Sequence, residues 1–214
     1  MKTAVIFDMD GLMLDTEKVY AQVNQEGFES LGIEFTMDDY LKYVGVGEKE
    51  TLQMYEEAIG DREAAEALLA REDKRYLEII KDKAPDLKDD LIKVLDTLAA
   101  KNVDCYVASS TNIETVEYLL EATGIRKYFK GVLGGDQVEN AKPDPEIYLK
   151  VVADFNLDKE KTIVLEDSIH GVNAAYQAGL DVIMVPDLVA PDDETYDRVL
   201  AVVGRLGDAL PFID

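Results

Sequence analysis

The chain has 214 residues, a length that suits one domain or one domain with an insertion. It is 47% hydrophobic and 31% charged, a composition typical of soluble globular proteins. The net charge of -23 argues against nucleic-acid binding, because no basic face is available to neutralise phosphates, and against binding to an anionic membrane surface. An anionic substrate would therefore need a few well-placed local cations.

Cysteine content and apolar runs bear on the cellular compartment. Cys105 is the only cysteine, so no internal disulfide forms, and its apolar surroundings predict a buried packing residue. The apolar run behind the N-terminus is too short for a signal peptide core, and no run approaches membrane-spanning length. We expect a cytoplasmic protein, a monomer or a weak homodimer, with no membrane partner.

The first predicted element is a strand at 4–7, which leads directly to Asp8 and Asp10. Side chains alternate along a strand, so carboxylates two residues apart share one face. Gly11 follows and lets the backbone turn sharply. Two adjacent carboxylates repel each other unless a positive group lies between them, and a hard divalent cation with oxygen ligands meets that need. Because Asp is frequent in this chain, the motif needs support from other strand ends.

The next stretch of the chain contains no convincing strand. Apolar periodicity predicts helices at 16–31, 37–43, 48–59 and 62–81. A strand-to-strand crossover does not need this length. We therefore predict that residues 15–83 form an inserted α-helical cap, that 1–14 and 84–214 form the core, and that hinges lie near 14–16 and 82–85.

The remainder of the chain alternates strands with helices. Further strands are predicted at 104–108, 131–133, 162–165 and 182–185, and helices at 89–101, 114–123, 144–155 and 169–177. Strands that are buried on both faces and alternate with helices predict an α/β fold, a doubly wound parallel sheet of Rossmann-like form.

Polar residues follow the predicted strands at the edge where such sheets bind ligands. Ser109 and Ser110 come after the second strand and just before a helix, where hydroxyls and free N–H groups form an anion site. Ser110 alternatively contributes only its backbone N–H. Lys142 supplies a cation after the third strand, and Glu166 and Asp167 follow the fourth. These four strand ends together predict a metal-assisted phosphate centre.

The residue types suggest a mechanism. Asp8 is the predicted nucleophile, forming an aspartyl phosphate, and Asp10 the predicted acid–base. Mg²⁺ would offset the repulsion between Asp8 and phosphate, with Asp167 and Glu166 among its ligands, although Glu166 is alternatively a solvated neighbour of Asp167. Lys142 would neutralise the equatorial phosphate oxygens.

Four ordered segments resemble the motifs of the haloacid dehalogenase-like hydrolase superfamily, in the branch with a small helical cap. These are FDMDGLMLDTE at 7–17, VASS at 107–110, AKP at 141–143 and LEDS at 165–168. The resemblance implies Mg²⁺-dependent phosphoryl transfer, with Asp8 as nucleophile and Asp167 as a metal ligand. It also implies that Asp10 is the acid–base and binds the metal through its carbonyl.

Within that branch the chain resembles sugar-phosphate and nucleotide-type monophosphatases and β-phosphoglucomutase. It departs from the mutase pattern at Tyr20, where the mutase has a His, and at Glu48, which replaces an Arg that grips the substrate's second phosphate. Lys49 is adjacent and can compensate. We take Gly45, Glu48 and Lys49 as candidate substrate residues of the cap.

The predicted function is therefore Mg²⁺-dependent hydrolysis of a small phosphomonoester, of the sugar phosphate or nucleoside monophosphate type. The alternative is a β-phosphoglucomutase-like phosphosugar mutase. A third reading is a non-catalytic binding protein on the same scaffold. Turnover across a panel of phosphoesters distinguishes this third reading from the first two.

Overall fold

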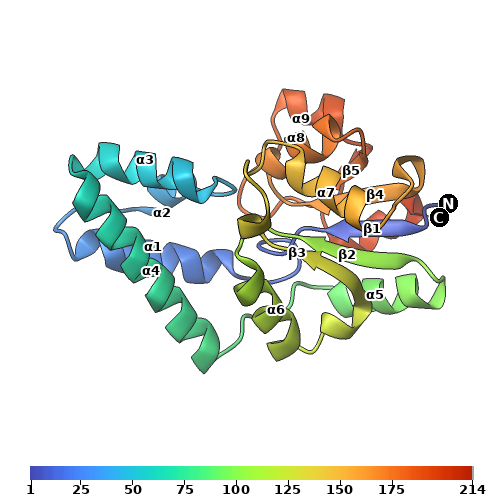
Figure 1. The fold of residues 1–214 in the computed structure, drawn as a ribbon, viewed down its shortest axis with the longest axis horizontal. Helices are drawn as coiled ribbons and strands as arrows, with labels where there is room; N and C mark the ends of the chain where they lie inside the picture. The colour runs from blue at the N-terminus through green and yellow to red at the C-terminus, as the bar shows by residue number, and fades with distance from the viewer. Residues whose placement is uncertain (214) are drawn as a thin grey trace.

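A six-stranded parallel sheet forms the centre of one half of the molecule (Figure 1). The strands are β1 (Ala4–Phe7), β2 (Asp104–Ala108), β3 (Phe129–Leu133), β4 (Thr162–Glu166), β5 (Asp181–Met184) and β6 (Ala201–Val202), in the order β3-β2-β1-β4-β5-β6. This arrangement confirms the predicted α/β fold. The computed structural model describes residues 1–213, so Asp214, the last residue of the predicted core segment 84–214, lies outside the described residues.

Helices cover both faces of the sheet. They are α5 (Leu91–Ala100), α6 (Ile113–Ala122), α7 (Glu146–Asp154) and α8 (Ile169–Gln177). Phe7 and Leu165 belong to an apolar cluster that contains buried residues of α5 and α6, whereas Ile6 and Val164 belong to one that contains residues of α7 and α8. The strand period of two thus sends alternate residues into separate halves of the core. Both faces of the sheet are therefore covered by apolar side chains, and polar side chains lie at the strand ends.

The other half of the molecule is helical and lies beside the sheet (Figure 1). It consists of α1 (Glu17–Glu29), α2 (Met37–Tyr40), α3 (Glu48–Ile59) and α4 (Arg62–Asp82). These helices have an apolar cluster of their own, which includes the stacked rings of Phe28 and Phe35, 4.6 Å apart, and the buried Tyr55. The helical region is thus present as predicted. Its limits at residues 15 and 83 stay a prediction.

Two neighbouring backbone segments connect the helical region to the sheet. Leu14 and Leu87 form an antiparallel bridge. The N–H group of Asp15 donates to the carbonyl of Asp86, and that of Lys88 donates to the carbonyl of Met13, both at 2.9 Å. The two crossings therefore lie side by side close to the predicted hinges.

Most predicted elements are present, with differences at their ends. The helices predicted at 48–59 and 169–177 have these bounds in the structure. The sequence analysis missed α9 (Asp193–Arg198) and β6, because elements of six and two residues are too short to show a clear period. Among the described residues, none of the helices combines the length and the apolar character needed to cross a membrane.

Candidate active site

The carboxyl ends of β1 and β4 bring three carboxylates together. Phe7 pairs with Leu165, and the N–H group of Asp8 donates to the Leu165 carbonyl at 3.0 Å, so Asp8 and Glu166 follow adjacent strands. One carboxylate oxygen from each of Asp8, Glu166 and Asp167 lies within 4.8 Å of the others, and all three residues are buried. The structure thus brings together three of the residues singled out in the sequence.

Lys142 joins this group from the loop before α7. Its ammonium donates to Asp8 Oδ1 at 2.6 Å, to Glu166 Oε1 at 2.6 Å and to the Ala108 carbonyl at 3.1 Å. The residue is only 5% exposed, so these charge-assisted bonds form away from bulk water. The ammonium also lies 5.0 Å from the centre of the Tyr148 ring. A single cation therefore links the ends of three strands.

Glu166 is surrounded by donors and holds Lys142 in place. Its Oε1 accepts from the Tyr148 hydroxyl at 2.6 Å as well as from Lys142. Its Oε2 accepts from the N–H groups of Asp167 and Ser168 and from the Ser168 hydroxyl. Gly171 leaves room for this carboxylate, because a Cβ there would lie 1.8 Å from Oε1. These contacts favour a positioning role for Glu166. Its predicted part in metal binding stays a prediction.

Asp10 lies at the turn after β1. Gly11 has a φ of +79°, a left-handed conformation that suits glycine, which explains the sharp turn. The hydroxyls of Ser109 and Thr111 donate to Asp10 Oδ2 at 3.0 and 2.9 Å. Asp10 Oδ1 is buried and has no hydrogen-bond partner among the described residues. The two predicted serines differ in their surroundings, because Ser109 is buried and contacts Asp10 whereas Ser110 is exposed.

The protein compensates the buried carboxylates of the site only in part. Burial raises the pKa of Asp8 well above its usual range, and Glu166 and Asp10 raise it further, while Lys142 opposes the shift. Burial also raises the pKa of Asp167 well above its usual range, with Asp8 and Glu166 adding to the effect. Burial alone would lower the pKa of Lys142, but Asp8 and Glu166 raise it. A single ammonium, that of Lys142, is thus the positive group that offsets the charge of several buried carboxylates.

A divalent cation fits this set of donors. Among residues 1–213, no group donates a hydrogen bond to the Asp167 carboxylate, and no basic side chain forms an ion pair with it. Asp8 Oδ2 likewise has no protein donor in the described part of the chain. Oxygen ligands from carboxylates are those that Mg²⁺ prefers. Asp8 and Asp167 are therefore the residues that would hold it.

The loop between α2 and α3 reaches toward the sheet (Figure 1). A Cβ at Gly45 would lie 3.2 Å from the Ser168 Cβ, so this part of the loop packs against the end of β4. Glu48 and Lys49 lie in the first turn of α3 and are exposed. Of the three candidate cap residues, Gly45 therefore has a clear contact beside the site, and the roles of all three in substrate binding stay predictions.

Glu17 was missed as a candidate in the sequence analysis, whereas Tyr20, noted there as a departure from the mutase pattern, also lies near the site. Glu17, only 7% exposed, accepts a hydrogen bond from the Tyr40 hydroxyl at 2.5 Å, and burial raises its pKa to about 7. The Tyr20 ring stacks on Tyr76, and its hydroxyl lies 3.4 Å from the Thr111 hydroxyl. Their signal was weak because acidic and aromatic residues in helices are ordinarily structural.

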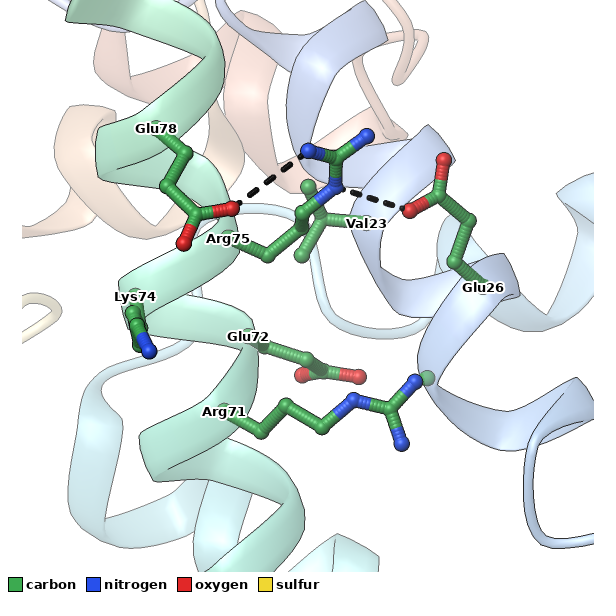
Figure 2. Close-up of a pocket in the computed structure, with 8 residues that line it drawn as sticks. Val23, Glu26, Arg71, Glu72, Lys74, Arg75 and Glu78 are labelled. Carbon is green, nitrogen blue, oxygen red and sulfur yellow. Dashed lines mark hydrogen bonds and ion pairs between the residues drawn. The ribbon is translucent and has the colours of Figure 1, made fainter.

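A second group of charges lies in the helical region, in a cavity of about 260 Å³ between α1 and α4 (Figure 2). Glu72 points between the two helices and is only 4% exposed. Its Oε2 accepts from Asn24 at 3.0 Å and from the Tyr55 hydroxyl at 2.6 Å, whereas Oε1 has no partner among the described residues. Arg75 spans the opening and pairs with Glu26 and Glu78 on its rim.

The chain is similar to known proteins in sequence and in fold. The chain is 37% identical over 181 residues to a phosphorylated carbohydrates phosphatase of Thermotoga maritima, covering 83% of this chain and 82% of that protein. It is 32% identical over 195 residues to (DL)-glycerol-3-phosphatase 2 of Arabidopsis thaliana, covering 86% and 80%. The fold matches the crystal structure of CbbY from Rhodobacter sphaeroides with a TM-score of 0.83 and 23% sequence identity. The match covers 98% of this chain and 96% of that one. Residues 5–185 match the haloacid dehalogenase-like hydrolase family, to which this enzyme therefore belongs.

Proposed function

We propose that this protein is a Mg²⁺-dependent phosphatase that hydrolyses a small phosphomonoester, of the sugar phosphate or nucleoside monophosphate type, through an aspartyl phosphate on Asp8. The observation that carries the proposal is the convergence of Asp8, Lys142 and Asp167 beside Asp10, whose buried Oδ1 has no partner among the described residues. Such an atom suits a group that exchanges a proton with substrate.

The first step forms a bond between an oxygen of the Asp8 carboxylate and phosphorus. Lys142 donates to Oδ1 of this carboxylate at 2.6 Å, which fixes the orientation of the carboxylate. The bond from phosphorus to the ester oxygen breaks, and Asp10 gives that oxygen a proton. Burial raises the pKa of Asp10, which favours the protonated form that this step requires.

The second step removes the phosphoryl group. Asp10, now ionised, takes a proton from water, and the water oxygen attacks phosphorus while the bond to Asp8 breaks. Inorganic phosphate leaves, and both carboxylates return to their starting forms. Lys142 remains beside the oxygens on which charge develops. Mg²⁺ held by Asp8 and Asp167 would supply Lewis-acid neutralisation of the phosphate charge.

Two relatives support small phosphorylated substrates. The Thermotoga maritima relative is named for phosphorylated carbohydrates, and the Arabidopsis thaliana relative for glycerol 3-phosphate. We propose that residues 15–83 act as a cap whose loop near Gly45 limits which substrates enter. The cytoplasmic location and the monomer or weak homodimer expected from the sequence stay predictions.

The mutase alternative has less support from the residues of the helical region. The position taken by His in the mutase pattern is Tyr20, whose ring is stacked on Tyr76 at 4.1 Å. Glu48 lies close enough to Asp73 to help raise the pKa of that carboxyl, after the larger effect of burial. Two acidic groups would repel the second phosphate of a sugar bisphosphate. Hydrolysis is therefore the better-supported outcome.

A phosphate-release screen tests the proposal. The purified protein is incubated with a panel of sugar phosphates, nucleoside monophosphates and glycerol phosphate, with Mg²⁺ and with EDTA. We expect phosphate release with Mg²⁺, loss of release with EDTA and recovery when Mg²⁺ is restored. β-Glucose 1-phosphate with a catalytic amount of glucose 1,6-bisphosphate forms a separate arm. Glucose 6-phosphate formation without phosphate release would favour the mutase, and no turnover in any arm would overturn both functions.

A further inference from the structure

Asp187 lies just beyond the end of β5 and has a carboxylate oxygen without a partner. Its Oδ1 accepts a hydrogen bond from Lys88 at 2.6 Å. Its Oδ2 is buried and has no hydrogen-bond partner within residues 1–213. A buried acceptor that lacks a donor destabilises the folded protein, and more so when it is charged. Such an atom calls for a donor that the protein itself does not supply.

The free oxygen of Asp187 lies beside the candidate metal site. A Cβ built on Gly11 would lie 2.2 Å from Asp167 Oδ2 and 3.5 Å from Asp187 Oδ2. Both oxygens therefore approach the same side of the Gly11 α-carbon. The absence of a side chain at Gly11 makes this approach possible, and its φ of +79° disfavours any other residue. Asp187 thus extends the carboxylate group formed by Asp8 and Asp167.

The charges around these oxygens are not balanced by the protein. The Asp167 carboxylate receives no hydrogen bond from the described residues. Lys142 contacts Asp8 and Glu166, and Lys88 contacts Asp187 through its other oxygen. Two ionised carboxylates cannot donate hydrogen bonds to each other. A hydrated cation meets both needs, because Asp167 can bind the ion while a water on that ion donates to Asp187.

Lys88 holds Asp187 in this orientation. The Lys88 ammonium lies 2.6 Å from Asp187 Oδ1 and 3.6 Å from Asp15 Oδ1. Its backbone N–H group donates to the carbonyl of Met13 at 2.9 Å. Lys88 and Asp15 both belong to the paired crossings between sheet and cap. The side chain of Asp187 is therefore fixed on one side and free on the side that faces Gly11.

We propose that Asp187 is a positioning residue for the divalent cation, whose hydration water donates a hydrogen bond to Oδ2 of this residue. The proposal rests on the proposed function, since it requires a cation held by Asp8 and Asp167. It adds the end of β5 to the site, next to the four strand ends that carry the sequence motifs. It also connects the ion, through Lys88, to the crossings on which the cap would move.

Calorimetric titration of Mg²⁺ without substrate tests the proposal, using the wild type, Asp187→Ala and Asp187→Asn. We expect Asp187→Ala to weaken Mg²⁺ binding by about tenfold or more, the usual effect of removing a group that orients a metal ligand or water. Asp187→Asn keeps an oxygen acceptor, so its loss should be smaller. Asp197→Asn is the matched control, because it makes the same change at an exposed residue of α9.

The outcomes separate this inference from the proposed function. If the wild type binds no Mg²⁺, the proposed cofactor and the role of Asp187 are both wrong. If the wild type binds Mg²⁺ and both Asp187 variants bind it within about twofold of wild type, only the inference is overturned. Equal losses for Asp187→Ala and Asp187→Asn would indicate a distant charge effect and also overturn it. Thermal unfolding of the Mg²⁺-free variants checks folding, and a role confined to anchoring Lys88 would change only this measurement.

Discussion

The molecule buries carboxylates in two regions, and their neighbours differ. At the sheet edge, Asp8 and Glu166 share the ammonium of Lys142. In the helical region, Glu72 accepts hydrogen bonds from two neutral donors, Asn24 and Tyr55, and has no ion pair in the described structure. Burial is similar, since Glu166 is 0% and Glu72 4% exposed. The two regions therefore differ in the groups that surround the buried carboxylate, not in how deeply it is buried.

This difference indicates how the negative charge of the buried acidic groups can be neutralised in each region. Glu72 can be protonated near neutral pH, because burial raises its pKa to about 7. The sheet edge already contains a buried ammonium, and Asp167 beside it has neither a donor nor a basic partner among residues 1–213. A proton on Glu72 stabilises the helical region, whereas a cation at the sheet edge would also bind and activate a phosphate. Burial of a carboxylate alone therefore does not mark a functional group.

Asp8→Asn tests the sheet-edge side of this comparison and should have the largest effect. The amide is a poor nucleophile, so we expect phosphate release to fall by at least about a thousandfold. Initial rates with the best substrate from the phosphate-release screen measure the loss. Circular dichroism should show an unchanged fold. Activity near that of the wild type would show that Asp8 is not the nucleophile.

Lys142→Met should affect both activity and stability. Removal of this ammonium leaves Asp8 and Glu166 buried without their shared cation, which costs about 3–5 kcal/mol of folding free energy in comparable pairs. Activity should fall by about a hundredfold or more, because a preorganised positive group at the reacting oxygens is lost. Urea unfolding and phosphate-release assays measure the two effects.

Lys150→Met is the control for this variant. Lys150 lies in α7, pairs with Asp154 and is partly exposed, so its removal should change stability by less than about 1 kcal/mol. Similar losses for Lys142→Met and Lys150→Met would contradict the special role given to Lys142.

The candidate site at the sheet edge was predictable because it follows from local rules. Apolar runs locate the strands, and parallel strands place their ends at one edge. Asp8, Asp10, Lys142 and Asp167 are each next to such a run or precede a helix, so their proximity could be inferred without knowing how side chains pack. The doubly wound fold was predictable for the same reason, since it depends on the order of elements.

The contacts that orient these residues could not be inferred in this way. Tyr148 donates to Glu166 from α7, and Thr111 donates to Asp10 from the loop after β2. Asp187 approaches Gly11 from the end of β5. Each contact depends on the distance between elements and on side-chain rotamers, which a single sequence does not contain. The first turn of α3 shows the same limit, because helical period alone could not say which way Glu48 and Lys49 point.

Glu72→Gln tests the cap side of the comparison. Because the folded pKa of Glu72 is raised to about 7 from 4.5, the folded state binds more protons than the unfolded state between these values. Wild-type stability should therefore fall as pH rises from about 5 to 8. The Gln variant removes the part of this dependence that Glu72 contributes, so it should be about 1–3 kcal/mol more stable than wild type at pH 8, with little difference at pH 5.

Urea unfolding of the metal-free proteins at both pH values measures this effect. Glu34→Gln is the matched control, because Glu34 is an exposed residue of the same region. A Gln variant that is less stable than wild type at pH 8 would mean that the ionised Glu72 is stabilised by a cation. The two regions would then bury their carboxylates in the same way.

Glu48→Arg should have the smallest effect and sharpens the comparison at the cap loop. Glu48 is exposed at the start of α3, and its negative charge acts on Asp73. Reversal of this charge should improve inhibition by glucose 1,6-bisphosphate by a few-fold, the range expected for about 1 kcal/mol or less from an exposed ion pair. Glu50→Arg, in the same helical turn, controls for the change in net charge. Equal effects of the two variants would show that Glu48 does not face the second phosphate, and the substrate-binding role predicted for this part of the loop would be wrong.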